Sequence, residues 1–369
     1  MKIDFANLGQ QYKTYKKEID SNVKKVLEAS SYILGPEIQE LEEQLEKFTG
    51  AKNCITCSSG TDALTLAMMC SDIGDGDEVI TTPFSYVATA DTIALLRAKP
   101  VFVDIEPNTF NIDPSKIEQA VTSKTKAIIP VSLFGQPSDL DEITKIAAAN
   151  NLKVIIDGAQ SFGSTYNNVS DSTLGDFSTT SFFPAKPLGC YGDGGAVFTN
   201  NLDYSEKLKK LRVHGQEKRY HHRYLGLGAR LDTIQAAILL VKLKYYKSEI
   251  EKRQEVASLY TELFSHNINI QTPVLGTKNT SVWAQYTLRV KDRERLQVNL
   301  SELGIPTAVH YPKSLHEQEC FGYLKYNKLS FPETERACEE VLSLPLNPFL
   351  TVNEVEFIAE NLNKLTSLQ

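Results

Sequence analysis

Three short segments of the sequence carry side chains that could do chemistry together. Lys186 stands between two prolines in SFFPAKPLGCYGDGG, Asp157 ends the apolar run KVIID, and Ser59, Gly60 and Thr61 open the helix-like run that follows NCITC. Each segment comes at or just after a run rich in Val, Ile, Thr or Phe, which predicts a strand. Ligands of open α/β sheets bind beyond the carboxyl ends of the strands, so the three segments are candidates for one site.

Each segment also has an ordinary interpretation. Lys186 could be an exposed loop lysine, whereas desolvation in its rigid and mostly uncharged turn would lower its pKa and make the amine nucleophilic. Asp157 could cap a helix, bind a metal or pair with a cationic ring nitrogen, because a buried carboxylate needs a partner. Ser59 or Thr61 could only cap the next helix, or the free N–H groups there could bind an anion.

Together the three segments favour one cofactor, pyridoxal phosphate. This cofactor needs an anion-binding loop for its phosphate, a lysine amine that condenses with its aldehyde, and an acid against its pyridine nitrogen. Tyr86, which is expected to open the helix after EVITTPFS, could stack on the ring. A nicotinamide cofactor is disfavoured, because SSGTDAL lacks the G-x-G-x-x-G pattern and GLGAR follows no strand-like run.

The elements that would position these residues alternate along the first two thirds of the chain. Continuous Val/Ile runs separated by amphipathic helices predict a parallel sheet buried on both faces, which is a doubly wound α/β fold. A long helix from Asp232 to about Phe264 suggests a boundary between a large domain, 1–245, and a smaller α+β domain, 246–369. In the smaller domain, WAQYTLRV and TAVHYP are predicted strands and VNEVEFIAENLNKL a closing helix.

Composition limits the possible partners and compartments. The 369 residues carry a formal net charge of −7, which argues against a nucleic-acid partner. No apolar run is long enough for a membrane helix, and MKIDFANLGQQYK has no signal-peptide pattern. Six cysteines without framework spacing are typical of a reducing compartment, so we expect a cytoplasmic protein. Cys54 and Cys57 form a lone CxxC and are expected in the core; no metal site is predicted.

The segments CSSGTDAL, PFSYVATADTIALL, VIIDGAQSFG and SFFPAKPLGCYGDGGAVFTN resemble the DegT/DnrJ/EryC-type sugar aminotransferases, which use pyridoxal phosphate. The resemblance runs from IDFANLGQQY to SLPLNP, and YILGPE, RYHH and RLDTIQAAIL are similar to the UDP-2-acetamido-2-deoxy-ribo-hexuluronate aminotransferases. It implies the aspartate aminotransferase-like fold (fold type I) and a homodimer with shared active sites. It also implies that the amino group of an amino acid, expected to be glutamate, moves to C3 of a nucleotide-linked keto-sugar for bacterial surface polysaccharide or O-antigen.

By the same resemblance, Lys186 attaches the cofactor, Asp157 contacts the pyridine nitrogen, Gln160 lies near the ring hydroxyl and Tyr86 stacks on the ring. The residues that match the phosphate-binding positions are Ser59, Gly60, Thr61 and Ser181.

The resemblance places Arg230, His310 and Tyr311 at the C6 end of the sugar, although His310 could also be a packed strand residue. The family commonly has asparagine where this chain has Gly228, so a phosphate contact from the neighbouring subunit is in doubt. Two alternatives stay open: a 3- or 4-aminotransferase acting on a dTDP- or UDP-linked keto-6-deoxy sugar, and a non-catalytic homologue that binds pyridoxal phosphate.

Overall fold

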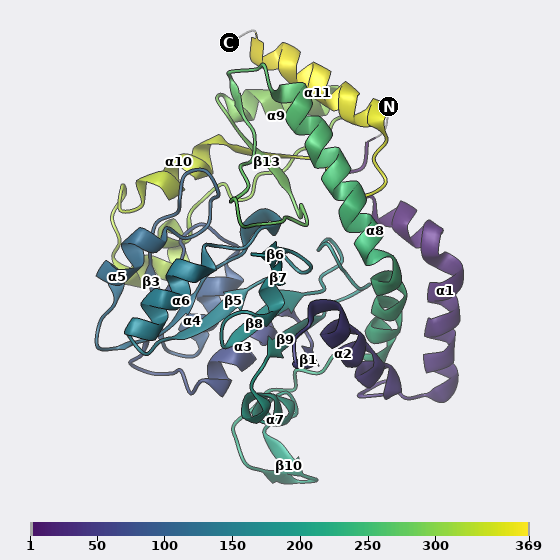
Figure 1. Ribbon diagram of the computed structural model, residues 1–369, viewed down its shortest axis with the longest axis vertical. Helices are drawn as coiled ribbons and strands as arrows, with labels where there is room; N and C mark the ends of the chain where they lie inside the picture. The colour runs from purple at the N-terminus through teal and green to yellow at the C-terminus, as the bar shows by residue number, and fades with distance from the viewer. Residues whose placement is uncertain (1–2, 368–369) are drawn as a thin grey trace.

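A seven-stranded sheet forms the centre of the computed structural model, which describes residues 3–367 (Figure 1). Its order is β1-β9-β8-β5-β4-β2-β3; β9 is antiparallel to both of its neighbours and the other pairings are parallel. The strands are β1 (Asn53–Cys57), β2 (Glu78–Thr81), β3 (Lys99–Phe102), β4 (Thr125–Ile129), β5 (Lys153–Asp157), β8 (Phe177–Ser181) and β9 (Gly195–Thr199). The mostly parallel α/β sheet predicted from the sequence is confirmed.

Both faces of this sheet are buried. Ile155 and Ile156, neighbours on β5, belong to two different hydrophobic clusters, because successive side chains of a strand point to opposite faces. Leu64 packs in the first cluster and Ile143 in the second, so helices cover both faces. The helices that surround the large sheet are α2 (Pro36–Thr49), α3 (Gly60–Cys70), α4 (Ala88–Leu95), α5 (Ile117–Ala120), α6 (Leu140–Ala149) and α7 (Leu202–Leu211).

The long helix α8 (Thr233–Phe264) reaches from the large sheet to a second core (Figure 1). Leu239 packs with residues of the large sheet, whereas Tyr260 packs on a three-stranded antiparallel sheet. The elements around this second core are β12 (Ile270–Gln271), β13 (Tyr286–Val290), β14 (Val341–Leu344), α9 (Arg293–Glu302) and α11 (Val352–Ser367). The division into 1–245 and 246–369 stays a prediction, since α8 runs unbroken across it.

Two local predictions are corrected. The strand expected in TAVHYP is absent from the described chain except for one bridge, in which Ala308 exchanges backbone hydrogen bonds of 3.1 and 2.8 Å with Ser343. Pro306 and Pro312 flank this segment and have no N–H to extend a ladder. Helix α4 begins at Ala88, so Tyr86 precedes it instead of opening it.

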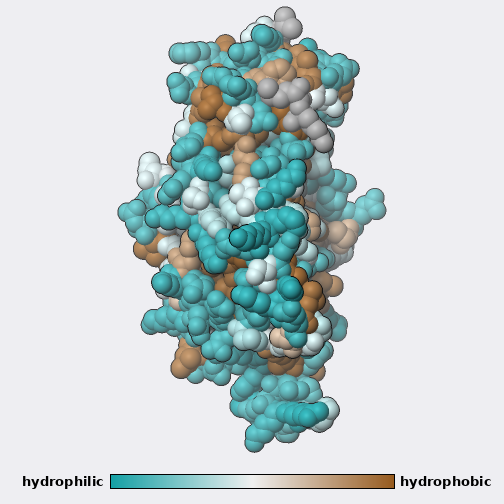
Figure 2. All heavy atoms as spheres, turned by 90° about the vertical axis from the view of Figure 1, so that its right-hand side faces the viewer, coloured by the Kyte–Doolittle hydropathy of each residue, from teal (hydrophilic) through white to brown (hydrophobic). Residues whose placement is uncertain are grey.

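The remaining elements lie at the periphery. Helix α1 (Leu8–Ala29) buries only Gln11, Ile19 and Val26, which explains why no clear apolar period announces it. A hairpin of β10 (Gln216–Lys218) and β11 (His221–His222) follows α7 and projects from the body as a mainly hydrophilic protrusion (Figures 1 and 2). The last elements are β6 (Thr165–Tyr166), β7 (Val169–Ser170) and α10 (Pro332–Glu340). No helix in 3–367 is both long and apolar enough to span a membrane.

Candidate active site

The adjacency of β5 and β8 brings Asp157 and Lys186 to one edge of the sheet. Asp157 is the last residue of β5, and Lys186 lies in the turn after the parallel neighbour β8, where its N–H donates to the carbonyl oxygen of Phe183 at 2.8 Å. Burial lowers the pKa of the Lys186 amine, and the charge of Asp157 opposes this shift. The structure therefore brings the predicted lysine and the predicted acid within electrostatic reach of each other.

Asp157 is held by donors that fit a carboxylate. Its side chain accepts a hydrogen bond from the Thr89 hydroxyl at 2.7 Å and one from the N–H of Ala159 at 3.2 Å. Burial raises the pKa of Asp157, whereas both hydrogen bonds and the charge of Lys186 lower it. Sequence reasoning missed Thr89 as a partner of Asp157. Its place three residues after Tyr86 was the only sign in the sequence that it could lie near the site.

The predicted phosphate-binding residues meet at the start of α3. The Ser59 hydroxyl caps this helix by accepting from the N–H of Asp62 at 3.0 Å, so the ordinary cap interpretation also holds. A Cβ on Gly60 would lie 2.7 Å from Cβ of Ser181, which shows how closely the two segments approach. The first N–H groups of a helix have no intrahelical acceptor, and Thr61 lies among them; this corner is therefore suited to an anion.

Gln160 links the turn after β5 to the segment that contains Tyr311. Its Oε1 accepts from the N–H of Phe134 at 2.9 Å, and its Nε2 donates to the Tyr311 hydroxyl at 3.1 Å. Burial raises the pKa of Tyr311, the hydrogen bond with Gln160 lowers it, and the charge of Asp157 raises it, which places Asp157 nearby. Tyr86 is 58% exposed, so its ring is free to stack on a ligand.

His310 lies within the electrostatic reach of Lys186. Its Nδ1 is 2.9 Å from the Ser343 hydroxyl, and burial together with the positive charge of Lys186 lowers the pKa of His310 to about 4. The imidazole is therefore neutral at pH 7 and can form hydrogen bonds but no ion pair.

Within residues 3–367, the Arg230 side chain makes no hydrogen bond or ion pair to this cluster, but its surroundings explain Gly228. A Cβ on Gly228 would lie 3.0 Å from Nε2 of His214 and 3.8 Å from Nη2 of Arg230. The His214 imidazole thus occupies the space that an asparagine side chain would enter. The Nε of Arg230 is buried and has no partner in the described part of the chain, so its guanidinium has unused donor capacity.

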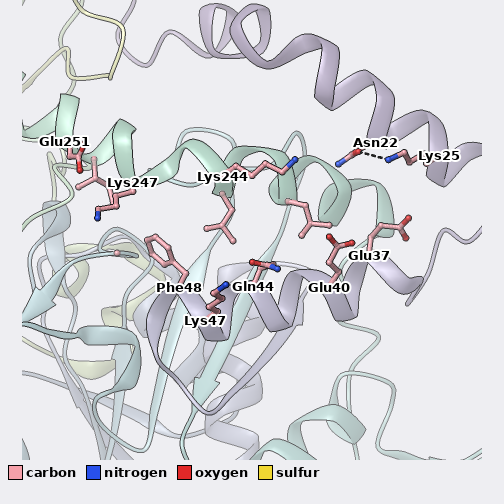
Figure 3. Close-up of a pocket in the computed structure, with 14 residues that line it drawn as sticks. Asn22, Lys25, Glu37, Glu40, Gln44, Lys47, Phe48, Lys244, Lys247 and Glu251 are labelled. Atoms are coloured by element: carbon pink, nitrogen blue, oxygen red, sulfur yellow. Dashed lines mark hydrogen bonds between the residues drawn. The ribbon is translucent and has the colours of Figure 1, made fainter.

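Two other features lie apart from the cluster. Cys54 and Cys57 are buried in hydrophobic clusters on opposite faces of β1, as expected for core residues, so the two thiols do not converge on one ion. A groove of about 960 Å³ opens between α1, α2 and α8, which supply its lining side chains (Figure 3). It is lined by both acidic and basic residues and by none of the predicted site residues.

The residues that converge here fit pyridoxal phosphate. A partly buried lysine faces a buried carboxylate, and a helix N-terminus with adjoining hydroxyls lies at the same edge of the sheet. An amine, an acid and an anion-binding corner are the three groups that this cofactor requires.

Comparisons with known proteins agree with this chemistry. Residues 13–363 match the model of the DegT/DnrJ/EryC1/StrS aminotransferase family. The chain is 48% identical to the UDP-2-acetamido-2-deoxy-3-oxo-D-glucuronate aminotransferase of Pseudomonas aeruginosa, over 96% of this chain and 98% of the relative. It is 42% identical to the dTDP-3-amino-3,6-dideoxy-alpha-D-galactopyranose transaminase of Aneurinibacillus thermoaerophilus, over 98% and 99% of the two chains.

A solved structure of the same kind contains the cofactor. The PLP form of the putative sugar aminotransferase Spr1654 from Streptococcus pneumoniae superposes with a TM-score of 0.90 and 27% identity, covering 95% of this chain and 96% of the other. The protein therefore belongs to the DegT/DnrJ/EryC1/StrS aminotransferase family and is a pyridoxal phosphate-dependent aminotransferase.

Proposed function

We propose that the enzyme transfers an amino group from an amino acid, glutamate, to C3 of UDP-2-acetamido-2-deoxy-3-keto-hexuronic acid. The observation that carries the catalytic part is the pairing of partly buried Lys186 with buried Asp157 at the ends of adjacent parallel strands. The substrate is supported by the name of the relative at 48% identity, which acts on a UDP-linked 3-oxo-glucuronate.

We assign the cofactor contacts to the residues around this pair. Lys186 attaches the cofactor, Asp157 holds a proton on the ring nitrogen, Gln160 contacts the ring hydroxyl and Tyr86 stacks on the ring. When bound, pyridoxal phosphate supplies an electron sink for the carbanion that forms when a substrate loses its α-proton. We assign the phosphate of the cofactor to the corner formed by Ser59, Gly60, Thr61 and Ser181.

The proton-transfer step falls to Lys186. Burial lowers the pKa of its amine, so the neutral amine, once displaced by the amino donor, can take a proton from the donor's α-carbon and return it. Asp157 keeps its charge best when a cation faces it, because burial alone raises its pKa. A ring nitrogen that carries a proton is such a cation.

The sugar's carboxylate requires a cation, and we assign that role to Arg230 and a neutral hydrogen bond to His310. Because the pKa of His310 is about 4, the imidazole offers a neutral hydrogen bond at pH 7. Arg230, with its unpartnered buried Nε, supplies the charge, and a guanidinium fork matches a carboxylate. Tyr311, already bonded to Gln160, completes this end of the site.

We further propose that two copies assemble with shared active sites. Tyr32, Ile33 and Leu34 form an exposed apolar run, and the mainly hydrophilic hairpin of β10 and β11 also exposes the side chain of Tyr220. Apolar surface of this kind is typical of an interface, and a partner subunit would cover it. We place the enzyme in the cytoplasm, since the six cysteines of each chain do not have the spacing of a disulfide framework. We place its reaction in the synthesis of a bacterial surface polysaccharide such as O-antigen.

A second candidate is amination of a dTDP- or UDP-linked keto-6-deoxy sugar at C3 or C4, favoured by the relative at 42% identity. The two candidates differ in charge at C6. Purified enzyme in its amino form is mixed with the UDP-linked 3-keto-uronate and, separately, with 3- and 4-keto-6-deoxy sugar nucleotides. Reaction with the uronate, weakened in Arg230→Gln through a higher KM, supports the first candidate. Reaction with only the neutral 6-deoxy sugars contradicts it.

A further inference from the structure

A second lysine, Lys242 of α8, contacts the loop that carries Lys186. Lys242 is 2% exposed; its Nζ donates a hydrogen bond to the carbonyl oxygen of Gly189 and lies 5.2 Å from the centre of the Tyr191 ring. Burial lowers the pKa of Lys242 to about 8, against the opposing charge of Glu249. Because burying an ammonium is costly, a lysine held in contact with this loop is expected to have a role there.

Gly189 is the residue on which the turn around Lys186 closes. A Cβ on Gly189 would lie 2.5 Å from the carbonyl oxygen of Pro184 and 2.6 Å from that of Phe183, so the two arms of the turn touch through their backbones. The N–H of Lys186 donates to the same Phe183 carbonyl at 2.8 Å. A group that fixes the Gly189 carbonyl therefore fixes the backbone of Lys186.

Helix α8 holds this loop at a second point. Gln235 accepts from the N–H of Tyr191 at 2.9 Å and donates to the carbonyl oxygen of the same residue at 3.4 Å. Gln235 and Lys242 are about two helical turns apart and thus lie on one face of α8. One face of helix α8 therefore holds the loop by hydrogen bonds at Gly189 and at Tyr191.

We propose that Lys242 is a positioning residue of the aminotransferase reaction. Through the Gly189 carbonyl it fixes the turn 183–189 and with it the point from which the Lys186 amine reaches the cofactor and the migrating proton. Within the described chain, Lys242 contacts Gly189 and Tyr191 of the loop and bonds to none of the residues assigned to the cofactor or the substrate. The inference rests on the proposed role of Lys186, and a Lys186→Ala control, inactive if that role is correct, separates a failure of the role from a failure of the inference.

The test compares Lys242→Met with Lys244→Met, both as holoenzymes. Lys244 lies on the same helix, but its side chain is 59% exposed and its Nζ pairs with Glu18 at 3.1 Å. The absorbance of bound pyridoxal phosphate is titrated with pH, and the single-turnover reaction with glutamate is followed at the same wavelengths. For Lys242→Met we expect a shifted titration midpoint and a rate reduced by roughly 10- to 100-fold at unchanged half-saturation. Lys244→Met should stay within twofold of the wild type, and Lys242→Arg should recover part of the rate.

A purely structural role gives a different result. If Lys242→Met lowers only the thermal midpoint and keeps the wild-type titration and rate, the inference is wrong. If Lys242→Met does not fold, Lys242→Gln takes its place, because it keeps a polar group in the same space; wild-type titration and rate in that variant would equally overturn the inference.

Discussion

At the scale of single residues, burial shifts the pKa values of the site groups in the direction that favours their neutral forms. The pKa of Lys186 and that of His310 are lowered, and the pKa of Asp157 is raised. Such paired displacements are typical of acid–base sites. The shifts suit the proposed roles: the Lys186 amine can accept a proton, the His310 imidazole is neutral, and the Asp157 carboxylate depends on its hydrogen-bond donors to stay charged.

Thr89→Val tests one of those donors. The Thr89 hydroxyl lowers the pKa of Asp157, so its removal raises that pKa, and the charged carboxylate is lost at a higher pH. The acid limb of the kcat/KM profile should move to higher pH, with little change above pH 8. Thr92→Val on the same helix, whose hydroxyl bonds to the Ala88 carbonyl, is the control. An acid limb unmoved in Thr89→Val would exclude this hydrogen bond as a determinant of the charge on Asp157.

At the scale of secondary structure, the strand ends could be predicted from the sequence and the contacts between distant elements could not. KVIID and NCITC indicate their strands because continuous apolar runs mark a sheet buried on both faces. Thr89 lies 68 residues before Asp157, and Lys242 lies 53 residues after Gly189. These pairs depend on how helices cross the sheet, which no local pattern encodes.

The approach of β9 to the start of α3 yields a prediction for Gly195→Ala. A Cβ there would lie 2.4 Å from the carbonyl oxygen of Ser59, so the helix N-terminus must shift. We expect the Kd for pyridoxal phosphate to rise and the unfolding free energy of the apoenzyme to fall by about 1–3 kcal/mol. In the control Gly9→Ala on α1, the added Cβ would meet no atom within 4 Å. This variant should keep the Kd and should not lose unfolding free energy, because alanine favours a helix over glycine. Unchanged cofactor affinity in Gly195→Ala would separate this corner from the phosphate.

Asp171, the first residue of a short 3₁₀ helix (Asp171–Thr173), ties that helix to the turn after β5, and this contact gives a pH dependence. Asp171 is 1% exposed, accepts a hydrogen bond from Ser161, and burial raises its pKa to about 7. A raised pKa in the folded state means that the stability it contributes is present at low pH and is lost as the pH rises toward 7.

Asp171→Asn removes this titration. Relative to the variant, the wild type should lose roughly 1 kcal/mol of unfolding free energy per pH unit between about pH 5 and 7. Urea unfolding of both apoenzymes over that range measures the difference. Parallel stability curves would show that Asp171 does not titrate there.

At the scale of the whole molecule, the proposed dimer with shared active sites yields a prediction for Arg230. Within the residues described, the buried Nε of Arg230 has no partner and the side chain makes no hydrogen bond to the Lys186 cluster. Lys186→Ala and Arg230→Gln enzymes are therefore mixed under conditions that exchange subunits, and they are assayed at a uronate concentration well below the raised KM of Arg230→Gln, where each variant alone has little activity. If Arg230 acts across the interface, hybrid dimers contain one intact site and activity returns. If activity does not return while light scattering shows dimers, Arg230 acts within its own subunit or not at all.

The proposed role of Lys186 is the centre of the account, and one measurement tests it most directly. The single-turnover reaction of glutamate with the pyridoxal phosphate form is followed by absorbance in the wild type and in Lys186→Ala, with folding checked by circular dichroism. We predict that the variant folds and binds the cofactor but reacts on the order of 10²- to 10⁴-fold more slowly, because the group that moves the proton is gone. A variant that reacts within tenfold of the wild-type rate would contradict the account.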